Sequence, residues 1–395
     1  MRTRFFIPLL LIGCMFAACT VDVPSGRPDA PVPIIFQAPA VGVATKTDAG
    51  YPNHEMPVGY NTSEKFCAFA MDASGVFASL DATAKSRYYM DEEECVYVSA
   101  YNAWAPVSAF YWLPAVVGTY YMNFQAYSPS VAGEDMTSLA HSWDNGFTFT
   151  GFVPRTPGQQ YDLLYSDRVT DKQRPDYNPN GGVPYEEDSG DAGSYNGIDL
   201  CFHHALASIK FQVMAKVPSD AIQQIHLQKL RVLNVWNKGS FSQSSGSWAV
   251  DADAAETAYV VYENTGDADD GVLLNEDLGF ITVENALMLI PQDLLHPGAD
   301  PVDTSDDTHI TIEITYTRTI VDTGKTVTAT ETADLVTGNS GGYYEDTTSG
   351  SPVDIDSWDM GRRYTYNLTL NLYKVLVDPT VTTWNNFTPE QNIEL

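Results

Sequence analysis

The histidines are the residues whose chemistry would be most useful in an active site, but their spacing does not support one. His203 and His204 are adjacent, so on a strand their side chains point to opposite faces and cannot act together. His54 precedes Glu55, yet the second histidine of a zinc-protease helix is missing four residues later. The sequence also lacks a Gly-rich phosphate loop that ends in Lys-Ser or Lys-Thr. We therefore predict a protein that is not an enzyme and that needs no cofactor.

Clustered acids suggest a calcium loop, which the spacing again does not support. Asp267, Asp269, Asp270 and Gly271 come closest to an EF-hand loop, but Leu278 stands where the bidentate glutamate is required. No Cys-x-x-Cys pair is present, so the sequence predicts neither a zinc site nor a redox site. These acids are expected to be solvated, and no metal site is predicted.

The N-terminus has the composition of an export signal. Arg2 and Arg4 supply positive charge, and Phe5–Phe16 is an uncharged, mostly apolar run that is too short to span a bilayer. The small residues Ala17–Ala18 come directly before Cys19, an arrangement that resembles a bacterial lipobox. In such a leader the cysteine thiol is acylated, and each buried methylene adds about 0.8 kcal/mol of anchoring.

Cys19 is the preferred lipidation site, and two alternatives stay open. Cys14 also fits a lipobox, but with a shorter apolar run before it, and the leader could be an ordinary secretory signal. All these readings place the mature protein outside the cytoplasm. Cys67, Cys95 and Cys201 remain after processing at Cys19, so at least one thiol is free. The sequence does not decide whether Cys67 and Cys95 are bonded.

The overall composition fits an exported protein with a substantial core. The chain has 51 Asp plus Glu against 21 Lys plus Arg, a formal net charge of −30. Such acidity argues against binding to nucleic acid or to anionic lipid. Because 44% of the residues are hydrophobic and 12% are aromatic, the chain can bury a core despite its charge. At 395 residues, two domains are expected.

Alternation of apolar and polar residues with a period of two predicts an all-β fold. Such alternation puts one face of each strand in a core and the other in water. It recurs in four segments: 122–126, 209–213, 310–315 and 364–372. Asp322–Lys325 between two threonine-rich runs predicts a hairpin, and a change of phase near Gln228 predicts a bulge. Many short strands separated by loops favour β-sandwiches. A polar zone at 171–196, rich in Pro, Gly and acids, predicts a domain boundary near residue 196.

Several short segments, in this order, resemble the fimbrillin family of Bacteroidales bacteria. The resemblance covers nearly the whole mature chain and rests on the order and spacing of the segments together with the lipobox. The matching segments are 34–38, 44–47, 111–114, 122–129, 162–166, 200–209, 289–292, 358–366 and 378–384.

This resemblance implies two tandem transthyretin-like β-sandwich domains, exported as a lipoprotein to the outer membrane and cell surface. It also implies assembly into fimbriae by strand exchange. A trypsin-like protease removes the first strand, and a strand from the next subunit fills the groove by main-chain hydrogen bonding. The expected divisions of the chain are 1–19 signal peptide, 20–46 propeptide, 47–195 N-terminal domain and 196–395 C-terminal domain.

By the same resemblance, Lys46 takes the place of the basic processing residue, with Arg27 as a second candidate that would leave the first strand attached. The removable strand would be residues 34–38, with 34–43 as a longer alternative, and the donor strand would come from 375–395. The residues expected to take part in strand exchange are Ile34, Ile35, Phe36, Val375, Val377, Ile393 and Leu395.

The expected function is that of a structural and adhesive fimbria subunit, with other subunits as partners and host glycans or proteins as further ligands. Segment 385–391 is polar, whereas a stalk subunit needs a long apolar donor strand, so a tip, anchor or accessory role is also considered. The alternative function is that of a monomeric, glycan-binding surface lipoprotein, which would carry a cluster of exposed aromatic rings. A cell-envelope enzyme is the least favoured reading, because no catalytic motif supports it.

Overall fold

The computed structural model describes thirteen ranges of the chain, and strands dominate them. Across these ranges, no helix has the length and apolar character needed to cross a membrane. Cys19, Arg27 and Lys46 lie outside the described residues, as do Ile393 and Leu395. The described ranges are 32–37, 40–41, 64–73, 88–112, 120–175, 197–218, 222–267, 271–296, 308–335, 344–345, 352–353, 355–371 and 374–383.

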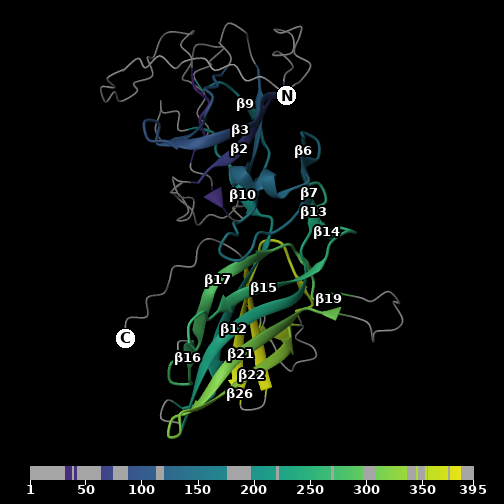
Figure 1. Ribbon diagram of the computed structural model, residues 1–395. Coiled ribbons are helices and arrows are strands. Elements are labelled where there is room, and N and C mark those ends of the chain that lie inside the picture. The colour runs from purple at the N-terminus through teal and green to yellow at the C-terminus, as the bar shows by residue number, and fades with distance from the viewer. Residues whose placement is uncertain are drawn as a thin grey trace, which may run out of the picture.

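One end of the molecule is built on a mixed sheet, here called the N-terminal sheet (Figure 1). Its interior is rich in aromatic rings and is filled by alternate residues of the strands, among them Phe66, Phe124 and Phe202. A short 3₁₀ helix, η2 (Ser130–Asp135), follows β5. In sheet order the strands are β1 (Ala40–Val41), β10 (Cys201–His204), β8 (Leu164–Ser166), β5 (Met122–Ser128), β2 (Phe66–Asp72), β3 (Tyr88–Val98) and β4 (Ala103–Pro106), with β9 (Val169–Lys172) paired to β5.

The other end is a two-sheet sandwich, here called the C-terminal sandwich (Figure 1). Both sheets contribute alternate apolar residues to one core, for example Phe211 and Tyr366 from one sheet and Leu230 and Ile312 from the other. The first sheet has the order β17 (Ile281–Leu289), β11 (Ala207–Ala215), β26 (Arg362–Asn371) and β27 (Lys374–Thr383). The second has the order β15 (Glu256–Glu263), β12 (Gln223–Trp236), β21 (Thr311–Ile320) and β22 (Lys325–Asp334), with β16 (Val272–Leu274) paired to β12. Short pairs join β18 (Gln292–Asp293) to β25 (Ser357–Trp358), β19 (Leu295–His296) to β20 (Thr308–His309), and β23 (Tyr344–Glu345) to β24 (Pro352–Val353).

The predicted strand patterns are confirmed in this region. The 209–213 alternation lies in β11, whose odd residues are buried, while Lys210 and Gln212 are half-exposed. The predicted hairpin joins β21 to β22 in continuous register from Ile320–Lys325 to Thr311–Asp334. Gly324 adopts φ +62° in this turn, a conformation that favours glycine. The predicted bulge is present in β12, where the register with β21 shifts between Leu227 and Lys229.

A third sheet, here called the joining sheet, takes strands from both halves of the chain. Its order is β14 (Ser247–Val250), β13 (Gly239–Ser242), β7 (Gly146–Phe152) and β6 (Ser138–Ser142). The central pairing of β13 with β7 connects residues about ninety positions apart, and their rings share one aromatic core. The joining sheet lies between the two ends of the elongated molecule (Figure 1).

The chain passes from one end of the molecule to the other shortly after the expected boundary near residue 196. Strand β10 comes after that position, yet it pairs with β8 inside the N-terminal sheet. The next strand, β11, belongs to the C-terminal sandwich, so the passage is made by Ala205 and Leu206. Both residues are fully buried in the aromatic core beneath the joining sheet.

We predict that the stability of this aromatic core depends on pH, because His141 on β6 packs into it. Its ring stacks on Phe69 with 4.4 Å between centroids, and its Nε2 lies 2.8 Å from Oε1 of Gln125. Burial lowers the pKa of His141 from 6.5 to about 4, because the charged form loses its hydration. The unfolded chain therefore takes up this proton first as the pH falls. This contribution to stability is complete above pH 6.5 and is lost by about pH 4, an effect of about 3 kcal/mol.

This dependence can be measured from urea unfolding midpoints between pH 4 and pH 7. His141→Phe keeps the aromatic packing and removes the titration, so we expect a flatter pH profile than in the unmodified protein. His309→Gln is the matched control, because His309 is a half-exposed histidine in the short strand β20. Equal slopes for the His141→Phe variant and the unmodified protein would show that another group carries the pH dependence.

Candidate strand-exchange site

Residues 32–37 lie in a gap between strands that are distant in sequence. On one side the Phe36 amide donates to the Trp104 carbonyl at 2.7 Å, and the Trp104 amide donates back at 2.9 Å. The Ile34 amide donates to the carbonyl of Phe110, also at 2.9 Å. On the other side the Ile198 amide donates to the Ile35 carbonyl at 2.8 Å. The segment therefore behaves as an inserted strand that bonds to neighbours on both sides.

Through these bonds, residues 32–37 connect β4 to the chain just before β10, two places that are far apart in the order of the N-terminal sheet. The sheet runs from β10 to β4 through β8, β5, β2 and β3. Phe36 pairs antiparallel with Trp104 on β4 and parallel with Ile198, which lies just before β10. Without residues 33–36, the edges at β4 and at Ile198 would lose their shared partner. The two edges would then have unpaired main-chain groups on either side of a gap, and such edges are ready templates for an added strand.

The side chains of the segment fill two sites on opposite faces. Ile34 and Phe36 are 1% and 0% exposed, and the Phe36 ring meets Phe66 and Phe124 edge-on at 5.5 and 6.0 Å. Ile35 points the other way and packs with Ala103 and Ala105. This alternation is the pattern by which an inserted strand is recognised through side-chain pockets.

Gly197 permits the close approach of the segment. Its φ is +107°, and a Cβ at this position would lie 2.9 Å from the amide nitrogen of Gln37 and 3.0 Å from the carbonyl oxygen of Ile35. A side chain here would therefore clash with the inserted backbone as well as strain its own. Sequence reasoning predicted the inserted segment but neither this glycine nor Trp104 and Ile198 as its partners, because no local pattern connects them.

The C-terminal residues named for strand exchange fall into two groups. Val375 and Val377 lie on β27 and pair with Leu370 and Leu368 of β26. β27 is an edge strand of its sheet within the described residues. In this state both valines already have main-chain partners, whereas Ile393 and Leu395 lie beyond the last described residue.

Cys67 and Cys95, which the sequence left open as a possible pair, are both free thiols in the structure. Cys67 and Cys95 lie on the paired strands β2 and β3, but they pack into different cores on opposite faces of the N-terminal sheet. Burial raises the pKa of Cys67 to about 11 and that of Cys95 well above its usual range. Because the thiolate is the reactive form, both side chains are unreactive packing residues at neutral pH.

Comparison with one solved structure supports the β fold, and two others are similar at lower scores. A fimbrial protein from Bacteroides vulgatus is 17% identical, with a TM-score of 0.54, covering 89% of this chain and 99% of that one. A protein named as a cell adhesion protein from Bacteroides uniformis has a TM-score of 0.46 at 12% identity, covering 90% and 99%. One from Bacteroides ovatus has a TM-score of 0.45 at 12% identity, covering 90% and 98%. A comparison with curated proteins gave no match.

The family comparison extends over most of the sequence. The model described as Fimbrillin-like matches residues 62–384, which include β2 through β27. The match covers the joining sheet, the C-terminal sandwich and all strands of the N-terminal sheet except β1. This chain therefore belongs to the Fimbrillin-like family.

Proposed function

We propose that this protein is a structural and adhesive subunit of cell-surface fimbriae, joined to its neighbours by β-strand exchange. The observation that carries the proposal is the insertion of residues 32–37, which bond to Trp104 on one side and Ile198 on the other. Removing this segment would expose two strand edges. It would also empty the apolar space filled by Ile34 and Phe36, here called the strand slot. A strand from the next subunit would then restore both the hydrogen bonds and the buried side chains. Membership of a family of fimbrial and adhesion proteins favours a structural role over an enzymatic one.

In this proposal Cys19 carries the lipid that delivers the subunit to the outer membrane, and Lys46 is where a protease releases the first strand. Lys46 lies in the sequence between β1 and β2, so cleavage there would separate residues 32–37 from the rest of the sheet. Cleavage at Arg27 would not, because the segment follows it. The family resemblance supplies these two assignments.

The donor strand in this proposal is the C-terminal segment 375–395. Val375 and Val377 would have to leave β26 in order to donate, whereas Ile393 and Leu395 follow the end of β27. The polar stretch 385–391 makes this a poor donor for a long stalk. A tip, anchor or accessory subunit is therefore the preferred role.

Limited trypsin digestion of the purified chain, followed by N-terminal sequencing and size analysis, tests the proposal. We expect a cut after Lys46, release of the fragment that contains residues 32–37, and formation of oligomers. A synthetic peptide of residues 32–41 should compete with assembly, because it refills the slot. Lys46→Gln should block both cleavage and assembly, whereas Arg27→Gln, as the matched control, should block neither.

The proposal also covers a subunit that accepts a strand only from a different protein. In that case the cleaved protein should stay monomeric. It should still bind an added peptide, such as residues 32–41, in the strand slot. If the cleaved protein releases its fragment and then neither oligomerises nor binds either that peptide or one of residues 375–395, strand exchange is rejected. Screening of glycans would then test the monomeric alternative.

A further inference from the structure

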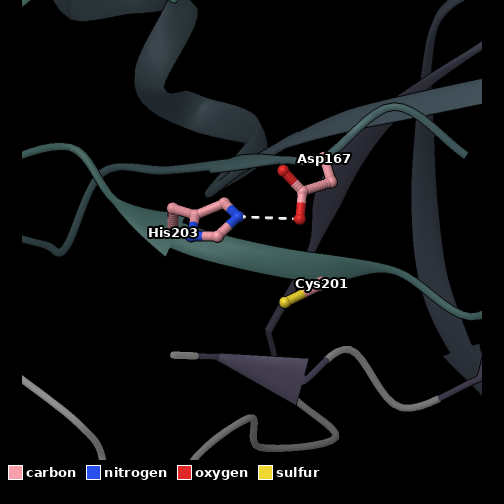
Figure 2. A group of neighbouring side chains, drawn as sticks. All are labelled: Asp167, Cys201 and His203. Carbon is pink, nitrogen blue, oxygen red and sulfur yellow. Dashed lines mark ion pairs between the residues drawn. The ribbon is translucent and has the colours of Figure 1, made fainter. Parts of the chain in front are cut away.

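Three side chains able to bind a metal ion gather at the edge of the N-terminal sheet. Cys201 and His203 are two residues apart on β10, so their side chains project from the same face. Asp167 follows the end of β8, the neighbouring strand. Figure 2 shows the carboxylate turned toward the imidazole, with the sulfur beside them. One ligand atom from each of the three lies within 4.8 Å of the other two.

The backbone holds these three residues in place. Tyr165 pairs with His203 and Ser166 with Phe202 in the antiparallel register of β8 and β10. The Asp167 amide donates to the Cys201 carbonyl at 2.9 Å, which fixes the start of the turn against β10. The ring of Tyr165 packs against that of His203, with 5.5 Å between centroids. The group is therefore positioned by strand pairing rather than by flexible loops.

Nε2 of His203, the ring nitrogen that faces Asp167, lacks a well-formed hydrogen bond within the described residues. Nε2 of His203 lies 2.9 Å from Oδ2 of Asp167. Within the described part of the chain, this buried atom makes no hydrogen bond of regular geometry. A cation between the imidazole and the carboxylate would satisfy both groups, and the nearby sulfur would complete a set of three donors.

The donor set suits zinc. Thiolate, imidazole and carboxylate are its usual protein ligands, at about 2.3, 2.0 and 2.1 Å respectively. A tetrahedral site with such bonds places its ligand atoms about 3.3–3.8 Å apart. The observed group, within 4.8 Å, needs only small side-chain rotations to reach that spacing. Harder cations such as calcium prefer all-oxygen sites with more ligands.

The group is also accessible from solvent. The side chain of Asp167 is 62% exposed and that of His203 is 26% exposed, so an ion can reach the group without opening the core. Three protein donors leave a fourth tetrahedral position for water or for an incoming ligand.

We propose that Cys201, His203 and Asp167 form a binding site for a single Zn²⁺ ion at the edge of the N-terminal sheet. None of these three residues lines the strand slot, and the proposed zinc site does not depend on the proposed assembly mechanism. Its signature in the sequence is only a Cys-x-His pair, and the third ligand comes from a residue 34 positions earlier. Such a pattern is too short to be recognised without the pairing of β8 with β10.

The test uses the purified full chain, reduced and freed of metal. Titration with Co²⁺ should give one equivalent of a thiolate-to-metal absorption band, which added Zn²⁺ should remove. Cys201→Ser should abolish the band, and His203→Gln and Asp167→Asn should each weaken Zn²⁺ binding by more than about tenfold. His309→Gln is the matched control, because His309 pairs with Asp334 at 3.4 Å and its side chain is equally exposed at 26%. That variant should bind Zn²⁺ as the unmodified chain does.

A second measurement needs no variant and therefore does not depend on mutant folding. Zn²⁺ should slow alkylation of Cys201 in the unmodified chain, as read by peptide mass spectrometry, while buried Cys67 and Cys95 serve as internal references. The proposal is overturned if the unmodified chain takes up no Zn²⁺. Binding that survives unchanged in folded Cys201→Ser and His203→Gln variants would equally overturn it, because the ion would then lie elsewhere.

Discussion

Phe36→Ala is expected to lower the free energy of unfolding of the unprocessed protein by about 3–5 kcal/mol. Phe36 is fully buried, and its ring meets Phe66 and Phe124 inside the N-terminal sheet. Truncation would leave a cavity that the surrounding strands can fill only in part. The loss should be seen as a lower urea midpoint with an unchanged slope, which marks a change in stability rather than in compactness.

The matched control for this substitution is Phe280→Ala, which removes the same ring from a site that is 42% exposed. That change should stay within about 0.5 kcal/mol of the unmodified protein. After proteolytic release of residues 32–37 the Phe36→Ala substitution should no longer matter, because the residue has left the fold. Similar stabilities for the two variants before cleavage would mean that the segment is not held in the slot in solution.

Phe241→Ala is expected to cost a similar amount, about 3–5 kcal/mol, and also to uncouple the two ends of the molecule. Phe241 lies on β13, yet its ring packs against Phe149 on β7 at 5.5 Å and Tyr165 on β8 at 5.0 Å. It is 1% exposed, so its removal would open the aromatic core shared by both halves of the chain. Cooperative unfolding depends on such shared burial.

Differential scanning calorimetry distinguishes these effects. The unmodified protein should unfold in one transition, and Phe241→Ala should split it into two, one for each end. Val250→Ala on the neighbouring strand β14 is the control, because Val250 is 39% exposed and its truncation should leave a single transition. A single, merely shifted transition for Phe241→Ala would show that other contacts couple the two ends.

The sequence predicted those parts of the fold that local patterns encode. Alternation identified β11, β21 and β26, because a strand with one buried face must place apolar residues at every second position. The glycine-containing turn at Gly324 and the phase change near Lys229 were readable for the same reason. The family resemblance was confirmed by the match over residues 62–384.

The features that escaped prediction are pairings between distant residues. Nothing in the local sequence shows that β13 pairs with β7, so the joining sheet could not be foreseen. The same holds for Ile198 and Trp104 as the two partners of Phe36. The group formed by Asp167 with Cys201 and His203 likewise exists only because β8 lies beside β10.

The joining sheet determines how this molecule would respond to tension. A subunit pulled from its two ends would transmit the load through two routes in parallel. One is the covalent passage at Ala205 and Leu206, and the other is the ladder of hydrogen bonds between β7 and β13. Two domains on a flexible tether would instead swing freely and extend before bearing any load. Under the proposed function, this architecture would make the subunit a stiff link that stretches little between its sheets when the fimbria is under load.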